Sequence, residues 1–163
     1  MTVILSEDVV VVVRPAIEEL YLDYVDALDE DRLEAWPLLF TEESSYRVIS
    51  RENVERGWPL ATMSCDSRAS MSDRVYAIRN TAMYVPRRLR HIISALRIRS
   101  VVDGYSVTAN FAVFETLPNH EPRVFSVGRY EDVVVVTADG LRFREKRCIY
   151  DSDLIPNSLL LPL

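Results

Sequence analysis

Two Asp-Gly pairs divide the second half of the chain into stretches in which apolar and polar residues alternate. Between Asp103-Gly104 and a looser segment at 118–122, every second residue of 105–113 is apolar. A β-strand turns successive side chains to opposite faces, so this alternation predicts a strand with one buried face. Asp-Gly is typical of tight hairpin turns, and Asp139-Gly140 repeats it. The pattern predicts four long strands joined in sequence, at 89–102, 105–115, 123–136 and 141–151.

The last predicted strand carries Lys146, the single lysine beside eighteen arginines. Strict alternation places it on the face opposite the apolar side chains of that strand. The two expected faces are Leu141, Phe143 and Ile149 against Arg142, Arg144 and Lys146. The excess of arginine gives weak support to a subunit interface, because the planar guanidinium pairs with carboxylates and stacks on aromatic rings. A GC-rich genome would produce the same excess.

Helices are predicted in the first half of the chain. Apolar residues at 17, 20, 21, 24, 25 and 28 form one stripe of helical period, and Pro15 suits a first turn, so a helix is expected over 15–28. A short second helix is expected after Asp31, whose side chain can cap it while Glu34 reaches back. Trp36 and Phe40 are expected in the core. A strand at 45–51 and a third helix at 66–82 follow.

Helices that precede a run of antiparallel strands predict an α+β domain. We expect a strongly curved, mostly antiparallel sheet wrapped around the helices, which is the cone of the nuclear-transport-factor-2-like (cystatin-like) fold. A single domain over 1–163 is expected, with a segment of about 1–14 and an apolar tail at 154–163 as extensions.

The apolar tail is expected to be buried. Six of residues 154–163 are Leu or Ile, and Pro156 and Pro162 oppose a regular helix or a central strand. Exposed, such a segment would form an adhesive patch. We therefore expect it to pack against a neighbouring subunit. The alternative is that it folds back over an edge of its own sheet.

Charge and composition exclude several classes of partner. The formal net charge of −6 opposes binding to nucleic acid or to an anionic membrane. No apolar run approaches the roughly 18–20 residues of a membrane span. Val9–Val13 is too short for a signal peptide and follows two acidic residues. Cys65 and Cys148 are expected to be reduced and buried, so the expected location is cytoplasmic.

Motifs for phosphate, metal or nucleophilic chemistry are missing from the sequence. The chain has four glycines and no Gly-rich phosphate loop. A Rieske cluster needs two Cys and two His in closely spaced pairs. Cys65, His91, His120 and Cys148 lie 26 to 29 residues apart. Neither a Rieske cluster nor a facial iron triad is expected in this chain.

His91 is the one residue that suggests catalysis. It lies near the start of a predicted central strand, where an Asp–His or Tyr–His pair could act as general acid and base. The candidate partners are Asp29, Asp31, Tyr24 and Tyr46. The alternative is a hydrogen-bonded structural histidine at a contact between helix and sheet or between subunits. The Arg87–Arg90 cluster lacks interleaved aromatic residues and is more typical of an ion-pair site than of a nucleic-acid site.

Three segments of the sequence form a recognisable set. The first is Leu28–Thr41, with its acidic turn followed by Trp36 and Phe40-Thr41. The second is Arg90–Ser94. The third is the ending, with Arg144, Lys146 and Arg147 before 151–153 and the apolar tail. Together they resemble the small (beta) subunits of aromatic-ring-hydroxylating dioxygenases, which are Rieske non-haem iron oxygenases, and the likeness extends over nearly the whole chain.

This resemblance implies a subunit of an oxidoreductase complex without an active site of its own. In that family the beta subunit forms a trimer beneath a trimer of alpha (large) subunits, an α3β3 assembly. The alpha subunit carries the Rieske 2Fe-2S cluster and the mononuclear Fe(II), fed with electrons from NAD(P)H. The implied role is assembly and stabilisation, with no catalytic, cofactor or metal residue in this chain. Residues 53–66 resemble variants that accompany oxygenases for aromatic acids such as anthranilate or salicylate.

Two other functions remain as competing hypotheses. One is a stand-alone dehydratase or isomerase of the same fold, with His91 as general base beside Asp31 and Tyr46. The other is a ligand-binding module with an apolar cone. A neighbouring gene that encodes Rieske Cys and His pairs would favour the dioxygenase subunit.

Overall fold

The computed structural model describes residues 7–152, 154 and 159–163. Six strands form one sheet in the order β2-β1-β6-β5-β4-β3. The predicted meander is confirmed within one residue at each end: β3 (Arg88–Val101), β4 (Gly104–Thr116), β5 (Arg123–Thr137) and β6 (Gly140–Tyr150) pair antiparallel. Asp103 has a positive φ of 61° beside Gly104, as a tight Asp-Gly turn requires.

The other two strands extend the sheet beyond β6. β1 (Phe40–Ser50) runs parallel to β6 and begins five residues earlier than predicted. β2 (Met63–Cys65) pairs antiparallel with β1 and was not predicted, because three residues are too few to show alternation. The short helix α2 (Arg51–Glu55) was missed for the same reason. The sheet is therefore mostly antiparallel, with one parallel pair.

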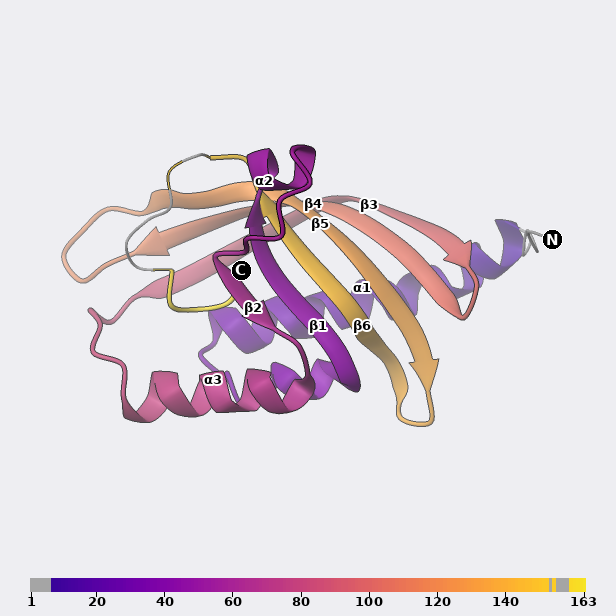
Figure 1. The fold of residues 1–163 in the computed structure, drawn as a ribbon, viewed down its shortest axis with the longest axis horizontal. Helices are drawn as coiled ribbons and strands as arrows, with labels where there is room; N and C mark the ends of the chain where they lie inside the picture. Colours follow the sequence, from indigo (N-terminus) through magenta and orange to yellow (C-terminus); the bar gives the residue numbers. More distant parts are fainter. Residues whose placement is uncertain (1–6, 153, 155–158) are drawn as a thin grey trace.

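Helix α1 (Glu7–Asp29) is longer than predicted. Pro15 lies inside it, so the expected extension at about 1–14 is in part helical. The predicted apolar stripe is confirmed, because Ile17, Leu20, Tyr21, Tyr24, Val25 and Leu28 are all buried. The sheet arches over α1, and α3 (Arg68–Asn80) lies on the same side (Figure 1). Helix and sheet together give the predicted α+β cone.

The predicted second helix is wrong. Residues 30–36 form turns, followed by the 3₁₀ helix η1 (Pro37–Leu39). Asp31 has a φ of 54°, and its carboxylate accepts two hydrogen bonds of 2.9 Å from Arg79 in α3 instead of capping a helix. Glu34 binds the same guanidinium at 2.8 Å. This ion pair with α3 replaces the expected capping box.

Trp36 is buried, as predicted. Its side chain is 0% exposed and lies edge-on to Tyr46 and Phe40, with ring centroids 5.0 and 6.0 Å apart. This packing fixes η1 beneath the start of β1 and joins the turn region to the aromatic core.

The middle of β5 requires a residue without a side chain. A Cβ added to Gly128 would lie 1.9 Å from the main-chain oxygen of Ile149 in β6. That distance is impossible for real atoms, so glycine permits the close approach of the two strands.

The apolar tail corrects one expectation. Pro162 and Leu163 are buried within the same chain, and Leu163 belongs to the core. Leu159, Leu160 and Leu161 are half-buried against that core. This is closer to the alternative, a tail folded onto its own domain, than to burial against a neighbour. Leu154 is exposed, and residues 153 and 155–158 lie outside the described part of the chain.

Within the described residues, no helix combines the length and apolar character that a membrane crossing needs.

Candidate functional site

The interior of the cone holds the only lysine of the chain. Lys146 is fully buried, although alternation placed it opposite the apolar side chains. A bulge explains the error: Val133 pairs with Glu145 and Val134 with Phe143, so Arg144 is an extra residue in β6. The extra residue turns Lys146 to the same inner face as Phe143. The sequence did contain a signal for this buried position, because Lys146 is the one lysine in a chain whose other basic side chains are arginines, apart from two histidines.

Lys146 is held by one carboxylate and a cage of aromatic rings. Its Nζ lies 2.8 Å from Asp132 Oδ2, and both side chains are 0% exposed. The same nitrogen lies 3.6 to 4.6 Å from four ring centroids, those of Tyr130, Tyr24, Tyr21 and Phe143. A buried cation is tolerated only when it is paired and surrounded by favourable dipoles, and ring faces supply these. The cage is complete without a ligand.

Burial governs the protonation of this cluster. It raises the pKa of Asp132, while the Lys146 ammonium and hydrogen bonds from Lys146, Tyr21 and the Arg147 amide oppose the rise. The Tyr21 hydroxyl donates to the Asp132 carboxylate. Desolvation also raises the pKa of Tyr21 well above its ordinary value. The hydroxyl therefore remains a donor, and the cluster is suited to holding Lys146 rather than to transferring protons.

Leu163 occupies a second part of the interior. Its main-chain oxygen accepts from Tyr24 and Tyr46 and lies 3.2 Å from Cys148 Sγ. Its amide donates to the Tyr46 hydroxyl at 2.8 Å. Burial raises the pKa of the Cys148 thiol to about 12 and raises those of Tyr24 and Tyr46. The hydroxyls of Tyr24 and Tyr46 are thus engaged by the chain itself, whereas the Tyr130 hydroxyl is buried without a hydrogen-bond partner among the described residues.

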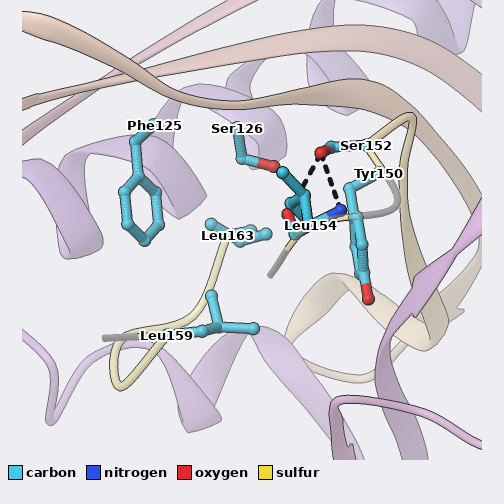
Figure 2. A pocket seen from close by; sticks show the side chains of 7 residues that line it. All are labelled: Phe125, Ser126, Tyr150, Ser152, Leu154, Leu159 and Leu163. Carbon is cyan, nitrogen blue, oxygen red and sulfur yellow. Dashed lines mark hydrogen bonds between the residues drawn. The ribbon is translucent and has the colours of Figure 1, made fainter. Parts of the chain in front are cut away.

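A small pocket remains beside Leu163. Its volume is about 60 Å³, and Phe125, Tyr150, Leu154 and Leu159 face it together with Ser126, Ser152 and Leu163 (Figure 2). Known ligand pockets are about 300–1,000 Å³, so this space is too small for an aromatic substrate.

His91 pairs with Asp29, one of the four partners considered. His91 Nδ1 lies 2.6 Å from Asp29 Oδ1, and the His91 amide donates to Oδ2 at 3.0 Å. The pair joins the end of α1 to β3, a contact between helix and sheet. His91 Nε2 is buried and has no hydrogen-bond partner among the described residues.

The structure does not join the three residues of the dehydratase hypothesis. Asp31 binds Arg79, Tyr46 binds Leu163, and His91 binds Asp29. The constellation predicted from sequence is therefore not assembled, and the carboxylate that matters for His91 is Asp29.

The described residues do not offer a set of donors that fits an iron centre. Across the described ranges, no group of three or more His, Cys, Asp or Glu side chains is placed to hold a metal. Cys65 and Cys148 are buried free thiols in different strands, and His120 Nδ1 lies 2.7 Å from the Pro118 oxygen.

Comparison with known proteins identifies the family. The family model described as ring hydroxylating beta subunit matches residues 24–157. The chain belongs to the ring-hydroxylating beta subunit family. It is therefore a small subunit of the aromatic-ring-hydroxylating dioxygenases, as the resemblance implied.

Individual relatives agree with the family. The chain is 38% identical to the anthranilate 1,2-dioxygenase small subunit of Burkholderia cepacia, over 86% of this chain and 88% of the relative. It is 30% identical to a terephthalate 1,2-dioxygenase beta subunit of Comamonas sp., over 86% and 92%. A solved beta subunit assigned to an aromatic-ring-hydroxylating dioxygenase of Novosphingobium aromaticivorans has a TM-score of 0.86 and 38% identity, over 95% of this chain and 99% of the other.

Proposed function

We propose that this beta subunit assembles with a large subunit into a cytoplasmic α3β3 oxygenase and contributes no catalytic residue. The Rieske cluster and the mononuclear iron would lie in the large subunit. The observation that carries the proposal is the filled interior of the cone. Lys146 and Leu163 occupy the space where a stand-alone enzyme of this shape would need a substrate.

We propose an aromatic carboxylic acid as the substrate of the assembled oxygenase. The names of both relatives contain such an acid, anthranilate in one and terephthalate in the other. Anthranilate is the first choice because that relative has the higher identity. This proposal concerns the complex, since recognition of the substrate would fall to the large subunit.

Co-expression with the large subunit encoded beside this gene tests the assembly. We expect a complex whose mass by sedimentation equals three copies of each chain, with iron that co-purifies only when the large subunit is present. Turnover of anthranilate would be compared with that of benzene, which lacks the carboxylate. A beta subunit that elutes alone at its chain mass of 18.7 kDa would contradict the proposal.

The pair of His91 and Asp29 is the specific observation that favours the dehydratase alternative. A histidine oriented by a carboxylate, with its second nitrogen free, is the arrangement that general bases use. The alternative requires space for a substrate at Nε2 and activity in the isolated chain.

A further inference from the structure

A bulge in β3 opens a hollow on the outer, convex face of the sheet. Ala95 and Leu96 of β3 both lie opposite Ala109 of β4, and Ala95 has a positive φ of 53°. The hollow beside this bulge has a volume of about 400 Å³, within the range of about 300–1,000 Å³ that is typical of ligand pockets. Its polar lining comes from three neighbouring strands and consists of Arg97, Thr108, Asn110, Arg129 and Glu131.

The hollow lies on the side of the sheet away from α1. Val107 and Ala109 in β4 are buried in the core, so alternation turns Thr108 to the outer face. The register sets Thr108 between Arg97 and Glu131 in one row across the sheet. The sheet arches over α1, which lies on its other side (Figure 1). The hollow is therefore separate from the filled interior of the cone.

Three hydrogen-bond donors on this lining are unpaired. Arg97, Thr108 and Asn110 make no hydrogen bond or ion pair with any residue in the described ranges. Their side chains offer a fork of guanidinium N–H groups, a hydroxyl and an amide. Donors that face one space without a partner in the protein are suited to an acceptor that comes from outside.

The hollow also carries an excess of positive charge. Glu131 lies 2.9 Å from Arg129 and 3.1 Å from Arg147, so two guanidinium groups share one carboxylate. Together with Arg97, three positive charges lie beside one negative charge, a local excess of two. This excess stands out in a chain whose net charge is −6. It favours an anion as the ligand.

We propose that this hollow binds a small organic carboxylate. The Arg97 guanidinium holds the carboxylate through two parallel N–H···O bonds, and the Thr108 hydroxyl and the Asn110 amide donate to the same group. The hollow is larger than an inorganic oxyanion fills, and the methyl groups of Ala95 and Thr108 offer apolar contact to the organic part of the ligand. Such binding gives the beta subunit a function beyond assembly.

Saturation-transfer NMR on the isolated beta subunit tests the site with benzoate as the probe. Benzamide has nearly the same shape without the charge. Arg97→Gln removes the guanidinium from the hollow. Arg88→Gln is the matched control, because Arg88 is an exposed arginine of the same strand that does not line the hollow. Titrations are made at 50 and 500 mM NaCl, and circular dichroism checks the fold of each variant.

We expect saturable binding of benzoate to the wild type and to Arg88→Gln at low salt. Binding to Arg97→Gln should be about tenfold weaker or more, because hydrogen bonds to a charged group are lost. Benzamide should show no saturable binding. High salt should weaken the binding of benzoate, because the charges of an open site are screened.

Competition with sulfate separates an organic carboxylate from a bare inorganic anion. At matched ionic strength, sulfate should displace benzoate only at concentrations well above the Kd of benzoate. Four results would each overturn the proposal: no saturable binding of benzoate, benzamide that binds as tightly, an equal loss in Arg88→Gln and Arg97→Gln, or sulfate that competes on equal terms.

This inference stands or falls separately from the proposed function. A beta subunit that binds benzoate but no large subunit would overturn the proposed function alone. A beta subunit that assembles with the large subunit but does not bind benzoate in its isolated form would overturn this inference alone.

Discussion

Burial sets the protonation state of several side chains in this beta subunit. Burial raises the pKa of the Cys148 thiol to about 12, and burial also raises the pKa values of the Tyr24 and Tyr46 hydroxyls. Each is held in its neutral form against Leu163. Burial thus makes residues that are reactive in other proteins inert here.

Stability should fall at alkaline pH because of Cys148. The folded chain keeps a proton that the unfolded chain releases between about pH 9 and about 12. The contribution of the protonated Cys148 thiol to the free energy of unfolding is complete below pH 9 and is lost as the pH rises from about 9 to about 12. We expect the melting temperature of the wild type to fall more steeply between pH 8.5 and 10.5 than that of Cys148→Ala, measured by circular dichroism. Equal slopes would contradict this assignment.

His91→Ala should lower the stability of the beta subunit without lowering the turnover of the assembled oxygenase. The substitution removes the imidazole from Asp29 Oδ1, and the Asp29 side chain is only 4% exposed, so we expect a cost of about 1–3 kcal/mol although the main-chain amide of residue 91 still donates to Oδ2. In the assembled oxygenase we expect unchanged turnover per intact complex. His120→Ala is the control, because that histidine is exposed and bound to a local carbonyl. A large loss of turnover with normal assembly and iron content would revive a catalytic role for this chain.

At the scale of elements, the tail and the sheet complete the core together. Leu163 reaches β1 and β6 through Tyr46 and Cys148, and Arg74 in α3 donates to the Leu160 oxygen at 2.9 Å. The segment 159–163 therefore acts as an internal element. Its removal would leave the Tyr46 hydroxyl, the Cys148 thiol and the Arg74 guanidinium without their partners in the tail and would expose apolar side chains of the core.

Deletion of residues 159–163 should destabilise the fold and admit solvent to the interior. Burial of a leucine stabilises by about 1.5–3 kcal/mol, so a clear drop in melting temperature is expected. Lys146 is the only lysine, so a label that an amine-reactive reagent leaves on a lysine side chain reports on Lys146 alone. Peptide mass mapping should find Lys146 unlabelled in the wild type and labelled in the truncated chain. Leu154→Ala, at an exposed position, is the control. An unlabelled Lys146 with an unchanged melting temperature would place the tail outside the core.

As a whole molecule, the chain combines a closed interior with an outer surface of unpaired charges. The polar groups inside are mostly paired with one another, whereas Arg88, Arg97 and Arg99 on the convex face are free of partners within the described ranges. This arrangement suits a protein whose work is done at its surface, in contact with other subunits.

The purified beta subunit alone should bind no stoichiometric iron or zinc. The motivation is the lack of any grouped His and Cys donors, seen in the spacing of the sequence and in the described side chains. Elemental analysis should find well under one metal per chain. About one metal per chain that is lost in His91→Ala would contradict the expectation.

The sequence by itself determined the long first helix, the four-stranded meander and the family. Alternation and Asp-Gly turns are local signals, so they place β3 to β6 within one residue. Tertiary structure alone decided three other features. A bulge at Arg144 turned Lys146 inward, an ion pair with Arg79 replaced the predicted cap at Asp31, and Leu163 packed inside its own cone. These depend on contacts between residues far apart in the chain, which no local pattern records.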